Sequence, residues 1–163
     1  YSWNHLAGAA MERYGADRLT IPVELNEREI RDSGVQGEMI VYGYLPMMIS
    51  AQCIRKTTLG CSGKSEIMWL KDRKDMRFPV VNQCRFCYNT IYNSAPLSLL
   101  GLSEQVTGLK PNAVRLNFTV EEPAAAGEIL DAFFEEYGMS EKAAEPPVLR
   151  NQFTRGHFKR GVE

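Results

Sequence analysis

The chain has 163 residues, of which 44% are hydrophobic and 24% are charged, and its formal net charge is −1. These proportions are typical of an ordinary soluble globular protein with one core or two small ones, and the near-zero charge argues against a protein coated with nucleic acid, although a local basic patch remains compatible with it. No apolar run approaches the roughly 18 residues that a membrane-spanning helix needs, so we expect no membrane contact.

The N-terminus lacks the features of a signal peptide, and four cysteines are too few for a disulfide scaffold in a chain of this length. We therefore expect a cytoplasmic protein with reduced thiols. The sequence has no initiator Met and opens within a helical pattern. This start indicates a piece of something larger.

The first part of the chain, residues 1–48, alternates between helical and strand periods. The pattern predicts a helix at 3–14, a strand at 17–25, a helix from the N-cap Asn26 to Gly34 and a strand at 37–45. Short connections between alternating elements are typical of a parallel α/β layer. Because only two strands are present, we expect the tail end of a barrel or open sheet whose earlier strands lie outside this sequence.

The alternation of helical and strand periods ends near Pro46, and two further regions follow at 49–100 and 101–163. The first should contain a loop-like stretch at 50–66, two strands around a charged turn at 67–81 and a partly helical stretch at 83–102. The second should contain a strand at 112–122, a helix starting at Pro123, a polar linker at 139–152 and a basic, aromatic end.

The four cysteines are spaced Cys53-x7-Cys61-x22-Cys84-x2-Cys87. A quartet of soft thiolates suits Zn²⁺ or an iron–sulfur cluster, and the Cys-x-x-Cys pair lets one turn present two sulfurs to one centre. The alternative is four reduced cysteines that pack in a core as small hydrophobes. A redox pair of the thioredoxin type is less favoured, because the preceding strand and the following long helix are not predicted.

The C-terminus gathers cations between two phenylalanines, Phe153 and Phe158. Basic side chains that alternate with aromatics can bind phosphates and stack on bases. The alternative is a solvated tail whose two aromatics pack on the core. The residues of this candidate nucleic-acid or anion site are Arg155, His157, Lys159 and Arg160.

Glu24 and Tyr42 are weak catalytic candidates, because each would lie near the carboxyl end of a predicted parallel strand. A capping carboxylate for Glu24 and core packing for Tyr42 are the alternatives. The sequence contains no Gly-x-Ser-x-Gly elbow, His-Glu-x-x-His motif or phosphate-binding glycine loop. No hydrolytic apparatus can be identified from the residues.

The phrases "DRLTIPVELNEREI", "VYGYLPMMISAQC", "LKDRKDMRFPVVNQCRFCYNTIYNSAPLSLL", "VRLNFTVEE" and "FTRGHFKRGVE" together resemble the C-terminal part of the collagenase-like peptidase family (unassigned class U, family thirty-two). The resemblance covers nearly the whole chain in the order of the family. It implies a mixed fold, α/β and α+β: the last two β/α units of a TIM-type barrel, followed by an α+β C-terminal extension.

The resemblance implies two chemistries. Some family members are described as proteases; other relatives serve in oxygen-independent hydroxylation, of RNA bases or of ubiquinone precursors, and hold a 4Fe–4S cluster through four cysteines. Carried onto this chain, the cluster ligands would be Cys53, Cys61, Cys84 and Cys87, and zinc would be the substitute if the cluster were lost. A thiolate-bound cluster suits electron transfer, whereas peptide hydrolysis needs an activated water or nucleophile, so we favour hydroxylation of RNA bases.

Two alternatives remain: a protease for collagen-like or other peptides, with catalytic groups mostly in the missing N-terminal half, and a non-catalytic substrate-binding module. The expected partners are that missing barrel half and an RNA or peptide substrate. An unpaired sheet edge would also favour a homo-oligomer of the fragment.

Overall fold

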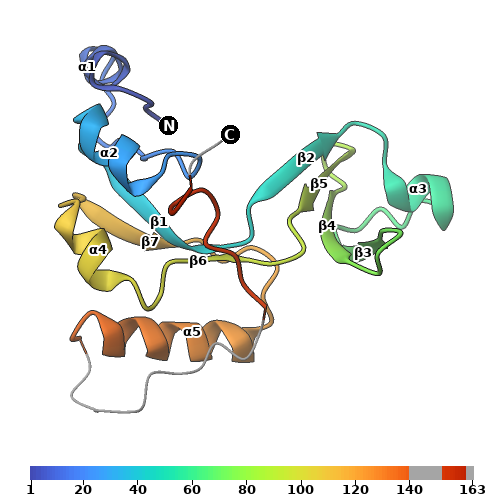
Figure 1. Ribbon diagram of the computed structural model, residues 1–163. Helices are drawn as coiled ribbons and strands as arrows, with labels where there is room; N and C mark the ends of the chain where they lie inside the picture. The colour runs from blue at the N-terminus through green and yellow to red at the C-terminus, as the bar shows by residue number, and fades with distance from the viewer. Residues whose placement is uncertain (140–151, 161–163) are drawn as a thin grey trace.

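The computed structural model describes residues 1–139 and 152–160, which form a mixed α/β arrangement of two sheets and five helices (Figure 1). None of the helices in this described part is both long and apolar enough to cross a bilayer. In chain order the elements are α1 His5–Arg13, α2 Glu27–Ser33, β1 Glu38–Gly43, β2 Pro46–Ser50, α3 Ile54–Thr58, β3 Ile67–Lys71, β4 Arg77–Gln83, β5 Tyr88–Tyr92, β6 Leu97–Ser98, α4 Ser103–Gly108, β7 Ala113–Leu116 and α5 Pro123–Glu136.

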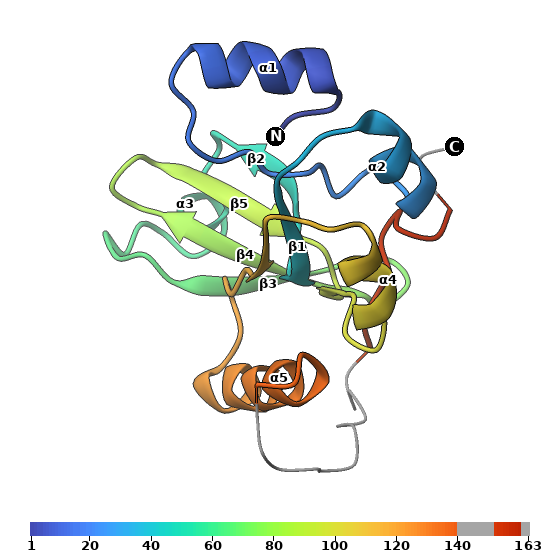
Figure 2. The ribbon, with the colours of Figure 1, turned by 90° about the vertical axis from the view of Figure 1, so that its left-hand side faces the viewer.

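The three-stranded sheet has the order β6-β1-β7 and contains most of the hydrophobic core. Its central strand β1 pairs in parallel with β7 and antiparallel with β6. Because β1 is central, its side chains are buried on both faces, and Val41 has no exposed surface. Helices α2 and α5 lie on opposite sides of this sheet, as the two perpendicular views show (Figures 1 and 2).

The four-stranded sheet has the order β2-β5-β4-β3, and all of its pairs are antiparallel. It extends away from the three-stranded sheet, with β2 and β3 at its edges and α3 in the long connection between them (Figure 1). Residues 46–92 therefore form a second structural unit, which we call the cysteine module because all four cysteines lie within it.

Several local predictions are confirmed. Asn26 caps α2 as expected, and it forms a capping box with Glu29; Gly34 ends the helix in the left-handed conformation with φ of 63°. The longest helix, α5, begins with Pro123 in its first turn and buries Ile129 and other apolar residues of one face. The two strands around the charged turn form the β3–β4 pair.

Other local predictions are wrong. The expected strand at 17–25 is reduced to a single parallel bridge between Thr20 and Glu38, because the chain turns at residues 23–25 toward the start of α2. The stretch at 83–102 is not helical but contains a turn, β5 and β6, and the loop-like stretch at 50–66 contains α3. Most of the predicted linker at 139–152 lies outside the described residues.

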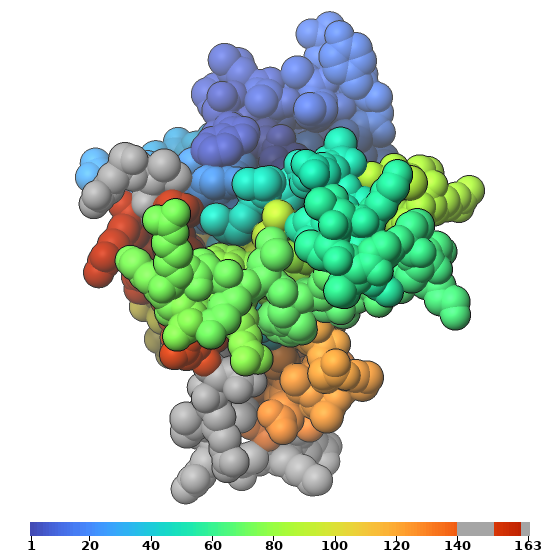
Figure 3. All heavy atoms as spheres, turned by 90° about the vertical axis from the view of Figure 1, so that its right-hand side faces the viewer, coloured from blue at the N-terminus to red at the C-terminus, as the bar shows by residue number. Residues whose placement is uncertain are grey.

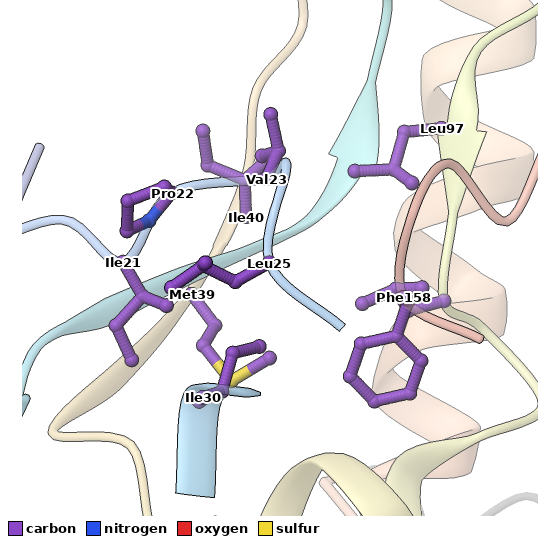
Figure 4. Close-up of a pocket in the computed structure, with 10 residues that line it drawn as sticks. Ile21, Pro22, Val23, Leu25, Ile30, Met39, Ile40, Leu97 and Phe158 are labelled. Atoms are coloured by element: carbon purple, nitrogen blue, oxygen red, sulfur yellow. The ribbon is translucent and has the colours of Figure 1, made fainter. Parts of the chain in front are cut away.

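The C-terminal segment packs onto the three-stranded sheet. Thr154 pairs with Leu97 in a parallel bridge, and the buried side chain of Phe158 helps to line a small apolar cavity of about 20 Å³ (Figure 4). The other walls of this cavity come from β1, from the segment before α2, from α2 itself and from Leu97 and Leu99 in and after β6. An apolar cavity of this size offers no polar partners for water.

This packing predicts a large loss of stability for Phe158→Ala. Removing a buried aromatic ring should lower the free energy of unfolding by about 3–5 kcal/mol. Urea denaturation of the variant and of Phe153→Ala, whose side chain is 39% exposed, measures the difference. An equally small effect of both substitutions would contradict a structural role for Phe158.

Candidate metal centre

Cys84 and Cys87 occupy the four-residue turn that joins β4 to β5. The N–H of Phe86 donates to the carbonyl of Gln83 at 3.0 Å and closes the turn. Cys87 then adopts a φ of 55°, a left-handed conformation that side chains other than glycine rarely take. Asp75 and Lys110 adopt the same conformation, with φ of 64° and 52°, so it is not specific to the cysteine pair.

Cys53 and Cys61 lie on either side of α3. The Sγ of Cys53 caps the helix and accepts the N–H of Lys56 at 3.4 Å. Gly60 and Gly63 flank Cys61, and both have positive φ values, 85° and 69°. Two glycines that can take the left-handed conformation let the chain turn sharply around Cys61.

The side chains of Glu66 and Asn89 hold the segment that carries Cys53 and Cys61 in place. The carboxylate of Glu66 accepts from the Nε of Arg55 and from the Oγ of Ser62. These two hydrogen bonds, that of Arg55 first, lower the pKa of Glu66. The Nδ2 of the fully buried Asn89 donates to the carbonyl of Gln52 at 2.7 Å, directly before Cys53.

The two segments bring all four cysteines to the wall of one hollow of about 480 Å³. Partial burial raises the pKa of the Cys84 thiol, and so do the neighbouring thiols of Cys61, Cys53 and Cys87. The Cys84 thiol donates to the carbonyl of Lys64 at 2.9 Å. Thiols separated by up to 34 positions in the sequence therefore share one electrostatic environment.

The donor chemistry of four thiols suits either a zinc ion or an iron–sulfur cluster. Zn–S bonds of about 2.3 Å place tetrahedral thiolates roughly 3.8 Å apart, and within residues 1–139 and 152–160 no three Cys, His, Asp or Glu side chains are arranged to hold one metal ion.

Buried amides lie beneath the hollow. Asn82 lines it and pairs directly with Asn89 across β4 and β5. In each of the two side chains the Oδ1 atom is buried, and within the described residues it has no hydrogen-bond partner. Asn82 donates only to the weak acceptor Sδ of Met68, at 3.4 Å. The floor of the site therefore carries polar groups whose hydrogen-bonding capacity is only partly used.

The catalytic candidates lie outside the cysteine module. Glu24 is half-buried in the turn before α2 rather than at a strand end. Tyr42 is buried in β1 with its ring 5.7 Å from that of Phe118. Neither residue lines the cysteine hollow.

Glu121 is a residue that the sequence reasoning missed. Burial is the main cause that raises the pKa values of Tyr42, Tyr44 and Tyr92, and the Glu121 carboxylate contributes to all three. Its Oε1 is buried and has no hydrogen-bond partner within the described residues. The feature of the sequence that could have identified Glu121 is its place near the carboxyl end of the strand predicted at 112–122. The same kind of position selected Glu24.

The basic C-terminal residues make different contacts. The Nη1 of Arg155 donates to the carbonyls of Ser98 and Leu100 at 2.8 and 2.6 Å. This guanidinium therefore holds the C-terminal segment against the backbone of residues 98–100. The Nζ of Lys159 donates to Gln105. The side chains of His157 and Arg160 are exposed, and none of the four residues lines the cysteine hollow.

Glycine at position 87 should give a more stable chain than alanine at that position. In the metal-free chain, Cys87→Gly should raise the free energy of unfolding by about 1 kcal/mol relative to Cys87→Ala, because glycine removes the left-handed strain. Urea denaturation of both variants measures this difference. Equal stability of the two variants would show that the turn relaxes around any residue.

The Glu66 hydrogen bonds should make the stability of the module depend on pH. A lowered carboxylate pKa contributes stability above the unfolded value of about 4.3, and the contribution is lost as the pH falls through the folded value. Glu66→Gln should therefore lower the urea midpoint at about pH 7 and have a smaller effect at about pH 3. The exposed Glu128→Gln provides the control, and an unchanged difference at both pH values would contradict the expectation.

Comparison with family models, with curated proteins and with solved structures found no match. The family to which the chain belongs is therefore not shown, and its function has to be inferred from the geometry of the site.

Proposed function

We propose that Cys53, Cys61, Cys84 and Cys87 bind a 4Fe–4S cluster and that the protein acts in oxygen-independent hydroxylation of RNA bases. One observation carries the proposal: thiols from two separate segments line a single hollow. Because hydroxylation of a base without O2 removes two electrons from that base, the cluster, when bound, would pass these electrons on to an acceptor.

The surroundings of the thiols support cluster binding. The backbone N–H of Lys56 already donates to the Sγ of Cys53, and hydrogen bonds to sulfur are one way in which proteins tune an iron–sulfur potential. Lys56 also lines the hollow, and a cation beside four thiolates offsets part of their negative charge. Cys61 and Cys87 are exposed, which leaves one side of the site open to a substrate or an electron acceptor.

The choice of RNA bases follows the resemblance of the sequence and is supported by the cations near the hollow. Lys56, Lys64 and Arg85 all lie in the two segments that carry the cysteines. Cysteines that serve as ligands need a reducing compartment, so the proposal also places the protein in the cytoplasm. A peptidase would instead need a nucleophile or an activated water.

The three-stranded sheet is proposed to be the end of a TIM-type barrel. Two observations support this assignment: β1 pairs in parallel with β7, and Thr20 forms a parallel bridge with Glu38. The remaining strands of such a barrel would come from chain outside this sequence. The cysteine module and the residues after β7 would then form the extension of that barrel.

Anaerobic purification followed by iron and sulfide analysis tests the cluster. We expect about four iron and four sulfide ions per chain and a visible charge-transfer absorbance. Replacing Cys61 with Ser should reduce both signals strongly, whereas Thr58→Ala, an exposed position of the same segment, should leave them unchanged.

Two outcomes would contradict the proposal. Stoichiometric zinc without sulfide in the anaerobic protein would assign the thiols to a single metal ion. Cleavage of casein or gelatin by protein that lacks iron would favour the peptidase alternative.

A further inference from the structure

The cysteine module has a charge that differs in sign from that of the rest of the chain. Residues 46–92 contain eight lysines and arginines and three acidic residues, a net charge of +5. Because the whole chain carries −1, the remaining residues carry −6. A positive unit joined to a negative one attracts polyanions such as nucleic acids to one part of the molecule only.

The four-stranded sheet also has an open face with apolar and aromatic side chains. Strand pairing places Ile49, Thr90, Val81 and Ile67 in one row, since residues opposite each other point to the same face. Two residues further along the strands, Trp69, Pro79 and Tyr92 share that face. The exposed fractions are 70% for Ile49, 46% for Ile67 and 55% for Trp69, all on the two edge strands, whereas Pro79 and Thr90 of the central strands are buried. Figure 3 shows the module, coloured teal to yellow-green, at the surface of the molecule.

The open face connects a basic end with the cysteine hollow. Lys71 and Arg77 lie opposite each other at one end of the β3–β4 pair and belong to the same face as Trp69. At the other end of the face, Gln83 and Tyr88 are paired, and both line the hollow. The seven residues of β4 span about 23 Å between the two ends.

The aromatic character continues at the hollow. The ring of Phe86, which is 66% exposed, stacks on that of Tyr88 with the ring centroids 6.3 Å apart. The guanidinium of Arg85 lies over Phe86, 5.3 Å from its centroid. Exposed rings with adjacent cations are the groups that bind the bases and phosphates of single-stranded nucleic acids.

We infer that the open face of the four-stranded sheet binds single-stranded RNA and leads it to the cysteine hollow. A base stacks on Trp69, phosphates contact Arg77 and Lys71, and the strand runs along β4 toward Tyr88. The exposed pair of Lys71 with Asp75 at 2.7 Å is no obstacle, because exposed ion pairs contribute little. The inference rests on the proposed function for the choice of RNA, and it assigns the surface by which that substrate reaches the site.

Trp69 and Trp3 are the only tryptophans in the chain, and both are about half exposed, which provides a matched pair of variants. The probe is a single-stranded oligouridine of about ten nucleotides, within the site sizes of known stacking platforms. Binding to the full chain is measured by fluorescence anisotropy at low salt. Trp69→Ala should weaken it about fivefold or more, and Trp3→Ala should not change it.

A second pair of variants tests the phosphate contact. Arg77→Gln should weaken binding and reduce the slope of log affinity against log salt by about one, as expected for one lost phosphate contact. Lys110→Gln, at an exposed position between α4 and β7, should leave the slope unchanged. In the Trp3→Phe variant, Trp69 is the sole reporter, and RNA should quench its emission.

Two results would overturn the inference, and a third would assign the face to another partner. Absence of RNA binding at low salt, or equal losses for Trp69→Ala and Trp3→Ala, would overturn it. Self-association that Trp69→Ala abolishes, without RNA binding, would assign the face to a second copy of the chain instead. Cys84→Ser removes a proposed cluster ligand and leaves the open face unchanged. If this variant loses iron and still binds RNA, the RNA surface and the cluster are independent, so that failure of one can be told from failure of the other.

Discussion

The register of β2 against β5 is the constraint on which the cysteine site depends. Ser50 lies opposite Asn89, so the chain leaves β2 beside the start of β5 and the turn that carries Cys84 and Cys87. The hydrogen bond from Asn89 to the carbonyl of Gln52 fixes this exit. A shift of one residue would turn every side chain of β2 to the opposite face and would move Cys53 away from the hairpin.

The same strand pairing creates the open face. Successive side chains of a strand point to opposite faces of the sheet, so Trp69 and Ile49 lie on the face opposite Asn82 and Asn89. Asn82 and Asn89 have little or no exposed surface, whereas on the other face the edge-strand residues Trp69 and Ile49 are exposed and the central Pro79 and Thr90 are buried. Hollow and open face are therefore two consequences of one sheet.

The two parts of the molecule use their polar groups differently. In the three-stranded sheet and the segments packed on it, Tyr42 is buried in the core and Arg155 is bonded to backbone carbonyls. In the cysteine module, Cys61, Cys87 and most cations are exposed, and Cys53 and Cys84 are half-buried. The core that stabilises the chain and the groups available for chemistry thus lie in different sheets, and substitutions at the hollow should affect folding less than substitutions around β1.

The sequence by itself determined the elements whose signals are local. The capping box of α2, the first-turn proline of α5 and the charged turn between β3 and β4 each depend on residues a few positions apart. The Cys-x-x-Cys spacing likewise sufficed to place two thiols on one turn. Only the tertiary structure decided the rest, because strand pairing and register join residues that are dozens of positions apart. It reduced the predicted strand at 17–25 to one bridge, showed β5 and β6 where a helical stretch was expected and placed Cys53 and Cys61 beside the β4–β5 turn.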